Sequence, residues 1–160
     1  MDVLFKIFQD AFFAAVAAIG FASISNPPRG ALKYCALIAA TGHATRFCLL
    51  NYAGVHIVAA SLAGALLIGI LAVWLAPKIK CPPEAFSYPA LLPMIPGMYA
   101  YHALQAFILS LSAHGEDEFQ HLFYLSESNA VICIFIILAM VIGQMLPILV
   151  FKRRSFTSTR

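Results

Sequence analysis

One apolar segment, residues 87–112, is long enough to cross a bilayer but cannot form a single straight helix. Pro89, Pro93 and Pro96 lie in its first half, and Gly97 follows directly. Proline has no N–H to donate, and its ring clashes with the carbonyl four residues earlier. Freed backbone groups are costly in lipid unless protein encloses them, as in the broken helices of transporters. The segment therefore indicates either a discontinuous span beside a cavity or a kinked helix that serves packing alone.

The rest of the chain has the composition of a membrane protein. Of its 160 residues, 62% are hydrophobic and 11% are charged, whereas soluble domains carry about 25% charged residues. Several apolar runs approach or exceed the roughly 18–20 residues that cross a bilayer as a helix. No run shows the strict alternation of a membrane β-barrel. These features predict an all-α fold, a polytopic bundle of transmembrane helices.

The apolar runs predict five spans, at residues 3–25, 31–52, 57–76, 87–112 and 123–151. We assign residues 1–151 to a single transmembrane domain and residues 152–160 to a basic tail. The last run is longer than a bilayer requires, so it either tilts or begins at the interface. Two connections are interpreted as loops: the proline-containing stretch 77–84 and the acidic stretch 113–121.

The basic residues predict the orientation of these spans. Eight of the ten lysines and arginines fall on one side, and the other two, Lys6 and Arg46, lie within spans. Because cytoplasmic loops are enriched in Lys and Arg, we expect the N-terminus outside and the C-terminus in the cytoplasm. The four cysteines have no CxxC spacing, and we expect neither a disulfide nor a metal site.

Three ionisable residues within spans are functional candidates, because such groups are costly in a membrane. At ~1.5 Å per residue, Asp10 lies roughly 10 Å deep from the outer side, and Arg46 lies roughly 9 Å deep. The two can meet at one level, although the sequence does not determine whether they face each other. His43 shares a helix face with Arg46, three residues away. The polar groups thus gather between the bilayer midplane and the outer surface.

This gathering predicts a substrate cavity. The planar guanidinium of Arg46 suits a carboxylate, and Asp10 would balance a substrate amine or take up a proton. His43 would carry a proton, since histidine titrates near neutral pH. The other candidate substrate-binding residues lie on the broken segment: Pro93, Pro96, Gly97 and Tyr101.

Each of these residues also has a purely structural interpretation. Asp10 and Arg46 would form a structural ion pair, His43 a hydrogen-bonded packing residue, and Tyr101 an aromatic residue at the outer interface. Lys6 would extend its ammonium to the surface. The chain has no GxSxG, HExxH or P-loop pattern, so we expect no enzyme activity, no catalytic residues and no cofactor.

Short motifs between residues 9 and 109 resemble a known transporter family. In order they are Gln9–Asp10, GF and NPP between residues 20 and 28, AL-x2-CAL at 31–37, GH-x2-R at 42–46 and PM-x-PG-x3-Y at 93–101. Their order resembles the small (YjjB-like) subunit of the threonine/serine exporter (ThrE-type) family. The last span and the tail are similar in hydropathy only.

The resemblance implies a two-component exporter in the bacterial inner membrane. The partner would be a larger ThrE-type subunit, with about five spans and a cytoplasmic N-terminal region, and the two halves would be inverted relative to each other. The expected function is proton-driven export of a small carboxylate-bearing metabolite: a threonine- or serine-like amino acid, or a C4-dicarboxylate such as succinate. The alternative is an assembly or scaffold subunit whose larger partner carries the site. We expect contact with lipid and no contact with nucleic acid. The sequence leaves open whether the complex forms a higher oligomer.

Overall fold

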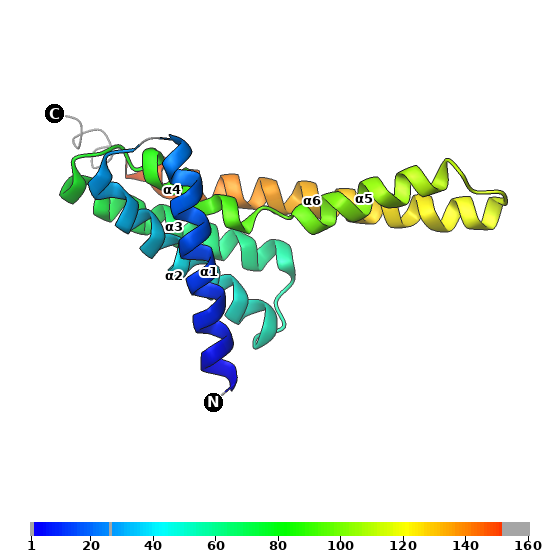
Figure 1. Ribbon diagram of the computed structural model, residues 1–160, viewed down its shortest axis with the longest axis horizontal. Coiled ribbons are helices and arrows are strands. Elements are labelled where there is room, and N and C mark those ends of the chain that lie inside the picture. Colours follow the sequence, from blue (N-terminus) through cyan, green and yellow to red (C-terminus); the bar gives the residue numbers. More distant parts are fainter. Residues whose placement is uncertain (1, 26, 152–160) are drawn as a thin grey trace. The chain divides into compact units, whose positions relative to one another are not determined.

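The computed structural model describes residues 2–25 and 27–151, and these residues are helical with short connections (Figure 1). In chain order the elements are α1 (Asp2–Ser25), α2 (Arg29–Asn51), α3 (Ile57–Ile79), α4 (Glu84–Leu91), the 3-10 helix η1 (Leu92–Met94), α5 (Gly97–Ser110) and α6 (Glu116–Val150). The expectation of an all-α fold is confirmed. The basic tail expected at 152–160 lies outside the described residues.

Three helices of the described chain are long and apolar enough to cross a membrane: Val3–Ser25, Ile57–Ile79 and Glu116–Val150. The helix α2 carries Lys33 and Arg46, which lower its hydropathy, and the segment expected to form the fourth span is divided between α4, η1 and α5. The count of five spans and their orientation stay predictions.

Two helices are longer than the sequence indicated. The helix α3 continues through Pro77 to Ile79, where a loop was expected, because a proline in the last turn removes only one hydrogen bond. Lys80 ends it in the left-handed conformation at φ 54°, and its N–H donates to the carbonyl of Ala76. The helix α6 begins at Glu116, so most of the expected acidic loop is helical. Acidic side chains in a first turn favour the helix N-terminus.

The chain divides into two compact units. One comprises the residues up to Met94 together with those from Ala139 onward, and the other comprises Ile95–Leu138. The first unit therefore contains α1 to η1 and the end of α6, and the second contains α5 and the beginning of α6. The expectation of a single transmembrane domain stays a prediction.

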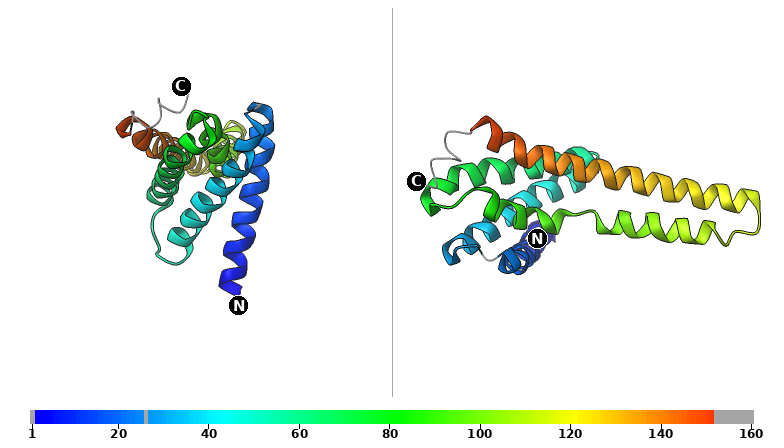
Figure 2. Two further views of the ribbon diagram at one scale, coloured as in Figure 1. Left: turned by 90° about the vertical axis from the view of Figure 1, so that its left-hand side faces the viewer. Right: turned by 90° about the horizontal axis from the view of Figure 1, so that it is seen from above.

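In the first unit, α2 contacts both α1 and α3, and α4 contacts all three of these helices (Figure 2). Glycines allow the closest approaches. A Cβ on Gly64 of α3 would lie 2.8 Å from the carbonyl oxygen of Gly42 on α2. A Cβ on Gly69 would lie 2.5 Å from the carbonyl oxygen of Gln144 on α6. The small residues that the sequence shows in α3 thus pack two different helices against it.

One polar pair is buried in this unit. The Gln144 amide donates to the Ser87 hydroxyl at 2.7 Å, and the two residues are 1% and 0% exposed. A buried amide without a partner costs free energy in a membrane as in water. The pair therefore fixes α4 against the end of α6.

In the second unit, α5 packs on the first half of α6. The hydroxyl of Ser126 on α6 donates to the carbonyl of Ala103 on α5 at 2.9 Å. A cavity of about 350 Å³ lies between the two helices, and its polar lining residues are His102, Gln105 and Asn129. The outer faces of both helices are apolar and exposed, for example at Leu104.

Candidate functional site

The expected break in the proline-rich segment is present, and it takes the form of a tight turn. Pro96 has φ −78° and ψ 57°, and the N–H of Gly97 donates to the carbonyl of Ile95 at 2.8 Å. This is an inverse γ-turn. In a continuous helix the N–H of Gly97 would instead donate to the carbonyl of Pro93. The turn therefore leaves the Pro93 carbonyl without its helical donor.

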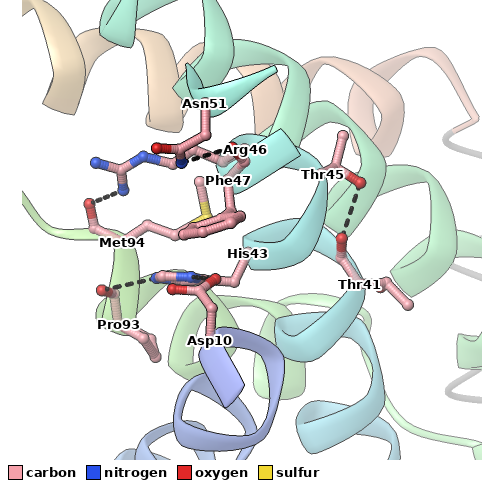
Figure 3. A network of polar contacts seen from close by, with 9 residues as sticks. All are labelled: Asp10, Thr41, His43, Thr45, Arg46, Phe47, Asn51, Pro93 and Met94. Carbon is pink, nitrogen blue, oxygen red and sulfur yellow. Dashed lines mark hydrogen bonds and ion pairs between the residues drawn. The ribbon is translucent and has the colours of Figure 1, made fainter. Parts of the chain in front are cut away.

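Two side chains of α2 contact the carbonyls before this turn (Figure 3). The Arg46 Nη1 donates to the carbonyl oxygen of Met94 at 2.7 Å, and the His43 Nε2 lies 3.4 Å from the carbonyl oxygen of Pro93. The two donors are one helical turn apart on α2, and their acceptors are consecutive residues of η1. Hydrogen bonds from charged donors are the strong ones. The helix α2 thus replaces hydrogen bonds that the break removes from the backbone.

The other nitrogen of His43 meets a carboxylate from α1. Its Nδ1 lies 2.6 Å from the Asp10 Oδ2, and both side chains are largely buried, at 21% and 23% exposure. A protonated imidazole donates from both nitrogens, whereas a neutral one has a single N–H. Only the protonated ring can therefore donate to Asp10 and to Pro93 at once, and in that form His43 links α2 to α1 and to η1.

The local packing of α2 directs these side chains to one side. Gly42 is buried, and Ile68 of α3 lies where a side chain would otherwise be. This close contact turns the adjacent His43 away from α3, toward α1 and η1. The Thr45 hydroxyl bonds to the carbonyl of Thr41 in its own helix at 2.8 Å, so it adds no link to the cluster.

The structure brings together four of the residues that the sequence proposed. They are Asp10, His43, Arg46 and Pro93, the last through its carbonyl. Asp10 forms an ion pair with His43. The sequence had left open whether Asp10 pairs with Arg46. The carbonyl of Met94 was missed. In a continuous helix the Met94 carbonyl would accept from the N–H of Met98, so the break at Pro96 and Gly97, which lies between them, would have indicated it.

The other three proposed residues belong to the unit that begins at Ile95. Pro96 forms the turn and also accepts a weak hydrogen bond at 3.9 Å from the Cys133 thiol. Gly97 begins α5. Tyr101 is 57% exposed, and its ring packs edge-on against that of His102 with centroids 5.5 Å apart. Their assignment to a substrate site stays a prediction.

A cavity of about 320 Å³ adjoins the Asp10–His43 pair. Its lining residues come from α1 and α2: Lys6, Gln9, Asp10, Phe13 and Phe47. The site thus combines a proton-bearing pair, an arginine bound to a broken backbone segment and a hollow large enough for a small molecule.

Comparisons with known proteins identify a family and curated relatives of this chain. Residues 10–150 match the family described as "Threonine/Serine exporter, ThrE". An uncharacterized protein of Haemophilus influenzae is 40% identical over 151 residues, which cover 94% of this chain and 50% of the relative. The chain therefore spans about half the length of that relative. No solved structure matches this chain.

Proposed function

Because the chain belongs to the threonine/serine exporter (ThrE) family, a family of membrane exporters, we propose that it is the small subunit of a two-component secondary transporter. Its substrate is a small carboxylate-bearing metabolite, either a threonine- or serine-like amino acid or a C4-dicarboxylate such as succinate. Export is driven by the proton gradient. The complex lies in the bacterial inner membrane, with the N-terminus of this chain outside and its C-terminus in the cytoplasm.

The two-component arrangement places a second half beside this chain. The H. influenzae protein is about twice as long as the segment that aligns with this chain. In the proposed complex, a separate, larger subunit with about five spans supplies the second half. A transport site between two repeats is the arrangement common in secondary transporters.

The observation that carries the proposal is the contact between Arg46 and the carbonyl of Met94, at 2.7 Å. A guanidinium inside an apolar bundle is costly and marks a substrate pathway by default. Its planar donors fit a carboxylate better than a single carbonyl. A substrate carboxylate would therefore compete with Met94 for Arg46, and its binding would loosen the broken segment at the position where the chain must move.

The Asp10–His43 pair supports proton coupling. Both side chains can carry a proton, and the imidazole of His43, on α2, contacts Asp10 of α1 and the Pro93 carbonyl at the break. Loss of the His43 proton would remove one of its two donated hydrogen bonds. In this proposal the proton strengthens the contact of η1 with α2 that Arg46 also makes, and its release weakens that contact.

The function is tested by export from proteoliposomes that contain this chain together with its larger subunit. We expect export of labelled threonine or of labelled succinate by the pair, and none by either subunit alone. Export by the larger subunit alone, at the rate of the pair, would favour the second candidate, an assembly subunit whose partner carries the site.

A second expectation concerns His43. Glutamine at this position keeps an amide that can donate to Asp10 but cannot be protonated. We expect the His43→Gln pair to retain substrate binding and to lose the stimulation of export by an imposed pH gradient. Initial rates with and without the gradient measure this, with His102→Gln, an exposed histidine of α5, as the matched control. Equal stimulation of the His43→Gln and wild-type pairs would exclude His43 from coupling.

A further inference from the structure

The cavity beside Asp10 contains charged groups that the contacts of His43 and Arg46 do not use. Its volume of about 320 Å³ is near the lower end of ligand pockets, which span ~300–1,000 Å³. Phe13 and Phe47 contribute apolar walls, and Lys6, Gln9 and Asp10 contribute the polar ones. A hollow of this size suits a small metabolite.

The polar wall comes from a single turn of α1. Lys6 and Asp10 are four residues apart, so their side chains share a face, and Gln9 lies next to Asp10 on the same cavity. An ammonium only donates, a carboxylate only accepts, and an amide does both. The Asp10 carboxylate has about four lone-pair positions, so it can accept from a ligand in addition to His43. One helical turn thus presents three different hydrogen-bonding groups.

A lysine near the end of a span usually places its stem on the apolar surface and its ammonium in water. Such a lysine contributes through its stem, and loss of its charge has little effect. Lys6 differs because it lines the same hollow as the carboxylate of the Asp10–His43 pair. Phe47, which closes that hollow on the α2 side, directly follows Arg46 in the sequence.

We propose that Lys6 is a specificity-determining residue that binds the substrate carboxylate in this cavity. Gln9 binds a neutral hydroxyl of the substrate, and Asp10 binds its ammonium. This inference rests on the proposed export function and narrows it: a small hydroxylated amino acid matches all three groups. A dicarboxylate does not, because its second carboxylate would face Asp10.

The test compares two competitors of labelled L-threonine in proteoliposomes that contain both subunits. L-threonine has the carboxylate, and L-threoninol has a hydroxymethyl group in its place. In the wild type we expect threonine to compete at least about 10-fold better. Lys6→Gln should raise the KM for threonine by about 10- to 100-fold, the range for loss of a hydrogen bond to a charged group, and leave competition by threoninol unchanged. Lys6→Arg should restore most of the preference.

Lys33→Gln is the matched control, because Lys33 is an exposed lysine of α2 that lies over the Tyr34 ring at 5.1 Å. An unchanged threonine preference in Lys6→Gln would overturn the role of Lys6 while leaving the export function intact. An equal loss of competition by threonine and by threoninol would also overturn it, since the charge of Lys6 would then serve the stability of the fold. Wild-type export of succinate in preference to threonine would overturn the assignment of Asp10. Absence of export in the wild type would instead contradict the proposed function.

Discussion

Replacement of Arg46 by glutamine is expected to lower export by at least about 100-fold while the two subunits remain assembled. Loss of one hydrogen bond to a charged group costs about 1.5–3 kcal/mol, a guanidinium makes two such bonds to a carboxylate, and each 1.4 kcal/mol is about a tenfold change. The Arg46 Nη1 donates to the Met94 carbonyl at 2.7 Å, and in the proposed function the same guanidinium binds the substrate carboxylate. Initial export rates, normalised to the amount of paired subunits in the membrane, measure the effect.

Two variants on the same helix turn make this result specific. Thr45→Val removes a hydroxyl that bonds only within α2 in the structure, and it should export at nearly the wild-type rate. Arg46→Lys keeps the charge but loses the planar fork, so an intermediate rate is expected. If Arg46→Gln fails to pair with the larger subunit while Thr45→Val pairs normally, Arg46 serves assembly. Normal export by Arg46→Gln would remove it from the substrate pathway.

A methyl group on Gly64 is expected to destabilise the protein by about 1–3 kcal/mol, the usual cost of overpacking. The added Cβ would lie 2.8 Å from the carbonyl oxygen of Gly42 and 2.9 Å from the Met94 methyl group. The first of these is a backbone atom, so α2 and α3 must separate. The Cβ of Arg46 lies 3.4 Å from the same position, and the separation would therefore displace the arginine. The melting temperature of purified Gly64→Ala in detergent measures the loss of stability.

Gly20→Ala is the matched control for this change. Gly20 lies inside α1, and its added Cβ would meet nothing within 4 Å. Alanine is favoured over glycine in a helix interior by up to about 1 kcal/mol, so this variant should be neutral or more stable. Equal melting temperatures for the two variants would mean that α2 and α3 separate enough to admit the methyl group without loss of stability.

Much of the site could be expected from the sequence because depth along a helix follows from residue counting. That reasoning places Asp10, His43 and Arg46 at similar levels and locates the break at the prolines. It does not give the rotation of each helix about its axis, which decides whether Asp10 meets His43 or Arg46. In the structure the close packing at Gly42 sets that rotation, and a contact between two distant glycines leaves no local signal in the sequence.

The helix ends were less predictable for a related reason. The acidic residues from Glu116 were interpreted as a loop, since charges are unfavourable in lipid. They form the first turn of α6, where negative charge interacts favourably with the helix dipole. Pro77 was interpreted as a helix end, but one missing hydrogen bond in a final turn is tolerated. In both cases composition gave the polarity of a segment correctly and its conformation incorrectly.

Arg46 and His43 each contact a main-chain oxygen of η1, and this affects how the protein tolerates mutation. A side-chain substitution at Met94 cannot delete its carbonyl, so a scan of that position reports the packing of a fully buried methionine rather than its polar contact. The acceptors depend instead on the turn at Pro96 and Gly97. A substitution at Pro96 that lets α5 continue backward would return these oxygens to helical hydrogen bonds, and it would impair the site without altering any residue that the two donors contact.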